Sequence, residues 1–312
     1  MATSAAVQFS RSLAAAWGSD VGYSFRRSPV AIASAFVLLV CIVAAVFAPW
    51  IAPHNPFDLR TLSLLDALAP PAWLPDAKPG YVLGTDDQGR DVLSAIMFGT
   101  RISLLIGLSA VGLAIFVGVA LGLVAGYAGG KLDAFIMRVA DVQLSFPAIL
   151  IALLIDGVAR AMLPRDAHSS VALFVLIFAI AAANWVQYAR TVRGSTMVEK
   201  SKEYVQAARV IGISPFGIMR RHLLPNVLGP VLVLATINIA TAVITEATLS
   251  FLGVGVPPTQ PSLGTLIRVG QDFLFSGEWW ITIFPGAALV IMVLAINLLG
   301  DWLRDALNPR LR

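Results

Sequence analysis

The chain has 312 residues, of which 58% are hydrophobic and only 13% are charged, and its mean hydropathy is +0.81. A soluble domain of this length needs a far more charged surface, so the composition excludes that class of protein. The net charge of +4 follows from membrane topology and requires no nucleic-acid surface. The single cysteine, Cys41, lies in an apolar run and therefore indicates neither a disulfide nor a metal site.

Long runs without Asp, Glu, Lys or Arg predict membrane-spanning helices, because about 20 apolar residues cross a hydrocarbon core of ~30 Å. One charge-free run, 247–267, holds three prolines and three glycines and is interpreted as a loop. A further span is needed between the second and third helical runs, and 137–157 supplies it, with Arg138 and Asp141 spaced to pair on one face. The sequence thus predicts an all-α integral membrane protein with six transmembrane helices, at 29–50, 102–127, 137–157, 169–190, 226–250 and 281–302.

The distribution of basic residues predicts the orientation of these spans. Fifteen Lys and Arg residues fall on the side of the N-terminus and seven on the other side, so both termini are expected in the cytoplasm. The predicted organisation begins with a cytoplasmic tail (1–28), a first transmembrane helix (29–52) and an outer segment (53–101). A core of five transmembrane helices follows (102–302) and contains a cytoplasmic loop at 191–225. The chain then ends in a second cytoplasmic tail (303–312). The first tail is expected to be either an amphipathic helix on the inner leaflet or disordered.

One sequence pattern lies just before the second span, and another lies within it. Thr85 followed by Gln88 is typical of a capping box and predicts a short outer helix that begins near Asp86. A calcium loop is the alternative, but the alternating ligands of such a loop are missing. Within the span, Gly118, Gly122 and Gly126 form a stripe that predicts close helix packing within or between subunits, with a substrate path as the less favoured interpretation.

Candidate chemistry is sparse. Glu246 is the one acid in a long apolar region, and it is interpreted equally well as a paired interfacial acid or as a residue that lines a polar cavity. The three histidines are scattered, and no hydrolase, zinc or paired-cysteine motif occurs. The segment 125–132 resembles a phosphate loop but lacks its first Gly and its Ser or Thr. We therefore expect no catalytic residue, no metal site and no ATP site in this chain.

The basic stretch at 199–224 predicts two short helices on the cytoplasmic side, the first from about Glu199 to Ile211. Gly212 suits the left-handed position that ends a helix, and Ser214-Pro215 suits the start of the next one. In the second helix we expect an apolar face formed by Phe216, Met219 and Leu223. We also expect a basic last turn, which contains Arg220 and Arg221. Either this helix rests on lipid headgroups or its apolar face docks into a cleft of a cytoplasmic partner.

A family resemblance favours docking. "QAARVIG", nine residues and "HLLP" resemble the EAA loop of bacterial ABC importer permeases. Gln206 replaces the acid of that motif and His222 replaces an Ile, which leaves open whether a neutral hydrogen bond replaces an ion pair. The segments "LGTDDQGRDVLS", "FPAILIALLI", "ATLSFLGVGVPPTQPSLGTL" and "NLLGDWLRDALNPRLR" are similar to the second permease of the dipeptide/oligopeptide/nickel group, the DppC/OppC type. The likeness covers about 26–312, although Leu263 stands where Trp is usual and Trp302 where Gly is common.

The resemblance implies a type I ABC importer permease fold in a bacterial inner membrane, with peptides as the expected cargo. The implied partners are a homologous permease, two cytoplasmic ATPases that bind ATP and Mg²⁺, and an external binding protein. The residues expected to couple to the ATPases are Gln206, Ala207, Ala208, Gly212, Ser214, Pro215, Phe216, Met219, Arg220, Leu224 and Pro225. Candidate pore or gate residues are Glu246, Ser250 and Phe251, and candidate residues facing the binding protein are Asp86, Arg90, Asp91, Pro257 and Pro258. The alternatives are related permeases for nickel chelates, opines or glutathione, and, remotely, a secondary transporter or channel.

Overall fold

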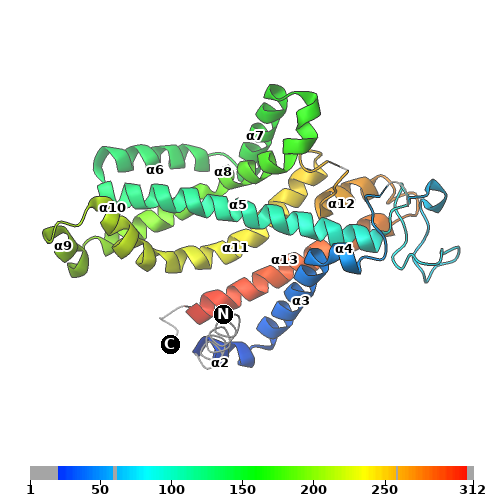
Figure 1. The fold of residues 1–312 in the computed structure, drawn as a ribbon, viewed down its shortest axis with the longest axis horizontal. Helices are drawn as coiled ribbons and strands as arrows, with labels where there is room; N and C mark the ends of the chain where they lie inside the picture. The colour runs from blue at the N-terminus through cyan, green and yellow to red at the C-terminus, as the bar shows by residue number, and fades with distance from the viewer. Residues whose placement is uncertain (1–19, 59–61, 258, 308–312) are drawn as a thin grey trace, which may run out of the picture.

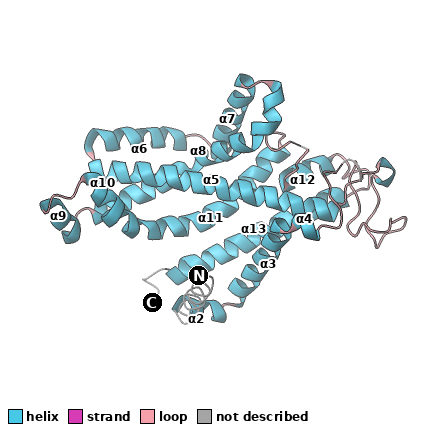
Figure 2. Cartoon of the chain, in the orientation of Figure 1, coloured by secondary structure: helices cyan, strands magenta, loops and turns pink. Residues whose placement is uncertain are grey.

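The computed structural model describes residues 20–58, 62–257 and 259–307, and in these ranges every regular element is a helix (Figures 1 and 2). The one β-contact in the described residues is an isolated bridge between Thr85 and Asp91. The helices are α2 (Asp20–Arg27), α3 (Pro29–Val46), α4 (Ala48–Ile51), η1 (Leu64–Asp66), α5 (Val92–Ala128), α6 (Gly130–Leu144), α7 (Ala148–Met162), α8 (Arg165–Glu199), α9 (Glu203–Val210), α10 (Pro215–Ile218), the π-helical η2 (Met219–Leu223), α11 (Leu224–Phe251), α12 (Leu263–Gln271) and α13 (Trp280–Leu307). The predicted all-α class is confirmed.

Five of the described helices are long and apolar enough to cross a membrane, and a bent pair of helices supplies a sixth crossing if it is counted as one span. Large apolar side chains project from these helices without protein around them, for example Phe36 at 66% exposed, Phe116 at 74% and Phe174 at 69%. Such a surface is unfavourable in water and favourable against lipid. The predicted multi-pass membrane protein is therefore confirmed.

The expected single helix at 137–157 is wrong. The chain there forms α6 and α7, which meet at a bend of 95°. Pro147 has no N–H to donate to the preceding turn, and its ring disfavours helical backbone at Phe146, so the helix stops at Leu144 and restarts after the proline. The expected pairing of Arg138 with Asp141 is also wrong, because Asp141 pairs with Arg190 on α8.

The centre of the molecule is a three-helix core formed by α5, α8 and α11, which run side by side (Figure 1). Buried side chains from all three helices meet there, among them Ile106, Leu176, Ile180, Val192 and Val227. The glycine stripe of α5 is the seam with α8: a Cβ at Gly118 would lie 2.5 Å from the Cβ of Tyr188, and one at Gly122 would lie 2.6 Å from the carbonyl of Ala189. The predicted packing seam is confirmed, and it lies within the chain.

A second core joins the first and last long helices to the others at the outer end. Ala45 of α3, Leu104 of α5, Val243 of α11, Leu263 of α12 and Met292 of α13 are all buried in it. At the other end of the molecule α2, which precedes α3, also contacts α13, since the ring of Phe25 meets the indole of Trp302 at 5.1 Å. Residues 1–19 and 308–312, which belong to the two predicted tails, lie outside the described residues.

The segment between α4 and α5 is mostly non-helical and lies at the end of the molecule opposite α9 (Figure 1). The capping box predicted at Thr85 and Gln88 is wrong. The Thr85 hydroxyl accepts a hydrogen bond from the backbone N–H of Ala69 at 2.8 Å, whereas Asp91 caps the helix by accepting from the N–H of Ser94 at 3.0 Å. Helix α5 therefore begins at Val92 and continues without a break into the membrane.

Candidate functional site

The end of the molecule that the sequence predicts to be cytoplasmic is built around a sharp turn between α9 and α10. Gly212 adopts a φ of +81°, and the N–H of Ile213 donates to the carbonyl of Ala208 at 3.0 Å, which closes the end of α9. Ser214 then caps α10, its hydroxyl accepting from the N–H of Gly217 at 3.2 Å, and Pro215 occupies the first turn. The predicted break and restart are confirmed, although α9 begins at Glu203, later than expected, because α8 extends to Glu199.

The second predicted helix is not a separate element. Helix α10 runs through the π-helical turn η2 into α11, so Pro215–Phe251 forms one continuous helical rod of 37 residues. The predicted apolar face is wrong in its membership: Leu223 is fully buried in the chain's own core together with Ile218, whereas Phe216 is 68% exposed. One extra residue in a π-turn rotates the following side chains, and a sequence pattern of period 3.6 does not show it.

The Ala-Ala pair of α9 is divided between two environments. Ala208 is buried against the chain's own core, whereas Ala207 is exposed. Gln206 is exposed and donates from its amide to the carbonyl of Lys200 at 3.1 Å, so it holds the turn between α8 and α9. The guanidinium of Arg209 lies 5.2 Å from the ring centre of Tyr127, which ties α9 to the end of α5.

Three apolar side chains form a projecting surface at this end, named here the apolar tip. Val210 is 87% exposed, Ile211 is 74% exposed and Phe216 is 68% exposed. Exposed Arg220 and Arg221 follow on the continuation of the same rod. Apolar side chains grouped on a polar end of a molecule are typical of a protein interaction site. Val210 and Ile211 were not among the residues expected from the sequence to couple to a partner.

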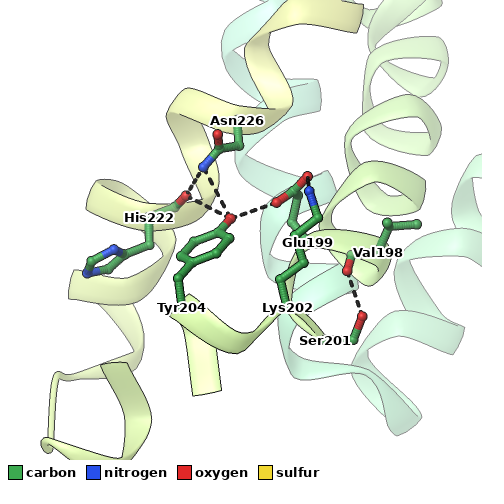
Figure 3. A network of polar contacts seen from close by, with 7 residues as sticks. All are labelled: Val198, Glu199, Ser201, Lys202, Tyr204, His222 and Asn226. Atoms are coloured by element: carbon green, nitrogen blue, oxygen red, sulfur yellow. Dashed lines mark hydrogen bonds and ion pairs between the residues drawn. The ribbon is translucent and has the colours of Figure 1, made fainter. Parts of the chain in front are cut away.

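Glu199, Tyr204 and Asn226 form a hydrogen-bonded group, named here the polar joint, which was also missed by sequence reasoning (Figure 3). The hydroxyl of Tyr204 in α9 donates to Glu199 Oε2 at 2.6 Å and accepts from Asn226 Nδ2 at 3.1 Å. Glu199 is the last residue of α8, and Asn226 lies in the first turn of α11. The sequence signal that could have indicated this joint is that Glu199 and Asn226 each lie next to an apolar membrane span.

Glu246 is fully buried between α5, α11 and α12. Its carboxyl oxygens accept hydrogen bonds from Ser103 and Ser250, both at 2.7 Å, and Ser103 also accepts from the N–H of Leu263 at 3.3 Å. Within the described ranges no cation pairs with this acid. Of the other two candidate gate residues, Ser250 is buried and Phe251 is 36% exposed. Glu246 is thus an internal link between three helices and has no cation as partner there, whereas its place in the lining of a polar cavity stays a prediction.

Three of the candidate outer residues, Asp86, Arg90 and Asp91, are buried. Asp86 accepts from the backbone N–H groups of Gln88 and Arg90 at 2.9 Å and from Arg90 Nε at 2.6 Å, so it organises the loop before α5. Pro257 is half-buried, and Pro258 lies outside the described residues. In the described part of the chain, no three His, Cys, Asp or Glu side chains gather closely enough to hold a metal ion.

These features define a class of protein: a multi-pass membrane component whose long helices end in an exposed apolar tip. Residues 118–312 match the family model described as the binding-protein-dependent transport system inner membrane component, and residues 16–71 match the N-terminal transmembrane domain of oligopeptide transport permease C. The chain belongs to the family of binding-protein-dependent transport system inner membrane components, and it is a permease subunit of the inner membrane.

Curated relatives extend over almost the whole chain. The di/tripeptide transport system permease protein DppC of Pseudomonas aeruginosa is 37% identical over 93% of this chain and 91% of its own length. The oligopeptide transport system permease protein OppC of Bacillus subtilis is 35% identical over 94% of this chain and 90% of its own length. An inward-facing structure of the MetNI methionine ABC transporter covers 69% of this chain and 96% of its own with a TM-score of 0.53 at 22% identity, which shows a shared fold.

Proposed function

We propose that this chain is a pore-forming permease subunit of an ATP-driven importer of di- or oligopeptides. The pore lies between this chain and a homologous permease, and an external binding protein delivers the peptide. Curated relatives between 35% and 40% identical support this proposal, because they are named as dipeptide, di/tripeptide, oligopeptide or peptide transport permeases. The binding protein supplies most of the selectivity for cargo in this proposal.

The apolar tip is the observation that supports coupling to ATPases. One of its residues, Phe216, lies on the short, capped helix α10, which continues as a single rod into the fifth span, so a force on Phe216 reaches Phe251 without crossing a flexible loop. Closure of two cytoplasmic ATPases around ATP and Mg²⁺ then moves this rod and changes the access of the pore. ATP hydrolysis belongs to those partners, and this chain contributes no catalytic group and binds no cofactor.

The outer end acts in this proposal as a fixed docking and gating frame. Asp86 and Arg90 hold the loop before α5 from within, and Glu246 and Ser103 hold the start of α12 against α5 and α11. Contact with the binding protein then falls to exposed neighbours such as Trp73 and Leu65, which are 58% and 88% exposed. Related cargoes such as nickel chelates, opines or glutathione are the alternative.

Uptake by the assembled transporter tests the cargo. The chain is reconstituted in proteoliposomes with its homologous permease, both ATPases and the binding protein, and uptake of labelled di- and tripeptides is compared with uptake of nickel and glutathione. We expect peptides to stimulate ATP hydrolysis and to accumulate inside. Stimulation by another cargo, with none by peptides, would replace the peptide assignment while keeping the importer assignment.

A pair of matched substitutions tests the docking surface. Phe216→Ser removes an exposed ring from the apolar tip, and Phe275→Ser removes one that is 96% exposed on the loop between α12 and α13 at the opposite end. We expect the first variant to lose co-purification of the ATPases and the second to retain it. Equal ATPase recovery from both variants would show that the tip does not dock the ATPases.

A further inference from the structure

The polar joint brings three separate helix ends to one hydroxyl group. Tyr204 lies in the first turn of α9, and its oxygen lies 2.6 Å from Glu199 Oε2 at the end of α8 and 3.1 Å from Asn226 Nδ2 at the start of α11 (Figure 3). Helices α8 and α11 both cross the membrane, whereas the end of α9 carries Val210 and Ile211, two of the three residues of the apolar tip. A single phenol therefore connects the docking element to two spans of the core.

Both partners of the phenol are themselves held in place. Lys202 Nζ lies 2.6 Å from the other oxygen of Glu199, and Asn226 Nδ2 also donates to the backbone carbonyl of His222 at 2.7 Å. Partial burial, followed by the hydrogen bond and the charge of Glu199, raises the pKa of Tyr204 to about 12. The phenol is consequently protonated at physiological pH and donates to the carboxylate, and hydrogen bonds to charged groups are stronger than neutral ones.

The joint lies where the rod of α10, η2 and α11 is least regular. Pro225 offers no N–H to the turn before it, and Leu224 N bonds to Met219 in the π-helical pattern. Single π-turns are frequent at functional sites, and they weaken the regular hydrogen-bond ladder. The side chain of Asn226 supplies a donor to the His222 carbonyl at this point, so the joint reinforces the rod where its backbone is irregular.

We propose that Tyr204 is a positioning residue that clamps the docking helix α9 to the ends of α8 and α11, so that a displacement of the apolar tip moves both spans together. This role rests on the proposed function of the chain as the coupled subunit of an importer. Without the clamp the ATPases still dock on the tip, but a push on its α9 part, Val210 and Ile211, is no longer passed to α8 and to the start of α11. ATP is then hydrolysed without a matching movement of the pore.

The test compares Tyr204→Phe with Tyr127→Phe in the complete transporter in proteoliposomes. Tyr127 is the matched control because it lies at the same end of the molecule, and its hydroxyl makes no hydrogen bond within the described residues, while its ring stays under Arg209 in the variant. The measured quantity is ATP hydrolysed per peptide transported. We expect a rise of at least about tenfold for Tyr204→Phe, in line with the loss of one hydrogen bond to a charged group, and no change for Tyr127→Phe.

Two further variants separate positioning from folding. Glu199→Gln keeps an acceptor for the phenol and should retain most of the coupling, whereas Glu199→Ala should behave like Tyr204→Phe. Recovery of the ATPases with the membrane subunits should equal that of the wild type in all four variants. Loss of the ATPases from Tyr204→Phe would assign the residue to docking and overturn the clamp, as would an unchanged ratio of ATP to peptide.

A measurement that needs no substrate separates this inference from the proposed function. Spin labels at Val198→Cys in α8 and Val210→Cys at the end of α9, both exposed positions, report the distance between the two helices after Cys41→Ser removes the native thiol. We expect Tyr204→Phe to broaden the distance distribution and Tyr127→Phe to leave it narrow. An equally narrow distribution in Tyr204→Phe overturns the clamp alone, whereas a wild-type complex without coupled uptake overturns the proposed function and the clamp with it.

Discussion

The carboxyl group of Glu246 accepts a hydrogen bond from the hydroxyl of Ser103 at 2.7 Å, although 143 residues separate the two in the chain. Ser103 in turn receives the backbone N–H of Leu263 at 3.3 Å. The pair therefore joins α5, α11 and α12 at the outer end of the core, where the loop around Pro257 begins. A buried polar link of this kind stabilises one arrangement of helices only while all of its members remain paired.

Substitutions of Glu246 should show how much stability this link contributes through its hydrogen bonds. Glu246→Ala leaves two buried hydroxyls without an acceptor and opens a cavity, and we expect it to cost about 2–4 kcal/mol of stability. Glu246→Gln retains the volume and one acceptor oxygen and should cost about half as much. Thermal unfolding of the purified transporter in detergent measures both. Equal losses for Ala and Gln would show that the hydrogen bonds are not what holds the three helices.

The glycine seam between α5 and α8 predicts that the same substitution, Gly→Ala, has very different effects on stability at two positions of α5. A Cβ at Gly122 would lie 2.6 Å from the Ala189 carbonyl and 2.8 Å from the Cβ of Val192, whereas a Cβ at Gly112 would meet nothing within 4 Å. Gly122→Ala should therefore cost about 1–3 kcal/mol by forcing the helices apart. Gly112→Ala should be neutral or slightly stabilising, because alanine favours the helix. Expression level and thermal unfolding of the two variants provide the comparison.

The seam, the turn at Gly212 and the cap at Ser214 were all predictable from the sequence, because each depends on residues close together in the chain. The helix at 137–157 was not predicted correctly, since its apolar residues continue through Pro147 and only the proline signals the bend. The short outer helix expected to begin near Asp86 was also wrong, because a capping box at Thr85 is a local pattern. The structure instead uses Thr85 to hold Ala69 and Asp66, which is a contact between distant segments.

In the candidate site, too, local features could be predicted from the sequence and contacts between distant segments could not. The position of the cytoplasmic loop could be predicted from its basic residues and spacing, but the burial of individual side chains could not. Phe216 and Leu223 belong to one predicted face, yet the π-turn between them places the first outside and the second inside. The polar joint depends on where α8, α9 and α11 end relative to each other, and no single stretch of sequence contains that information.

The buried ion pair of the outer segment should be far more important to stability than the exposed pair nearby. Arg90 and Asp86 have side chains that are only 4% exposed, whereas those of Lys78 and Asp66 are 39% and 30% exposed. Arg90→Ala leaves a buried carboxylate without its partner and should cost about 3–5 kcal/mol. Lys78→Ala should cost less than about 1 kcal/mol. The difference in unfolding temperature between the two variants checks this order, and comparable losses would contradict it.

Asp87 should make the outer segment sensitive to pH. Burial, and then the neighbouring carboxylate of Asp86, raise the pKa of Asp87 in the folded chain. The unfolded chain has the ordinary value of about 3.9, so the contribution of this group to stability is complete below that pH and is lost as the pH rises through the folded pKa. Asp87→Asn cannot ionise and should unfold at a higher temperature than the wild type at pH 8. This advantage should shrink as the pH is lowered toward 4, and an advantage independent of pH would exclude ionisation as its cause.

The turn at Gly212 allows a test of coupling in which side-chain packing is held constant. Its φ of +81° is strained for any residue with a Cβ, and a Cβ there would meet nothing within 4 Å, so a substitution acts on the backbone alone. Gly212→Val should cost about 1–3 kcal/mol in the left-handed region and shift α9 relative to α10, whereas Gly212→Asn tolerates that region and serves as the control. We expect the Val variant to lose peptide uptake or ATPase docking, and the Asn variant to retain both. Wild-type uptake by Gly212→Val would show that the angle between the two helices is not what transmits the movement of the ATPases.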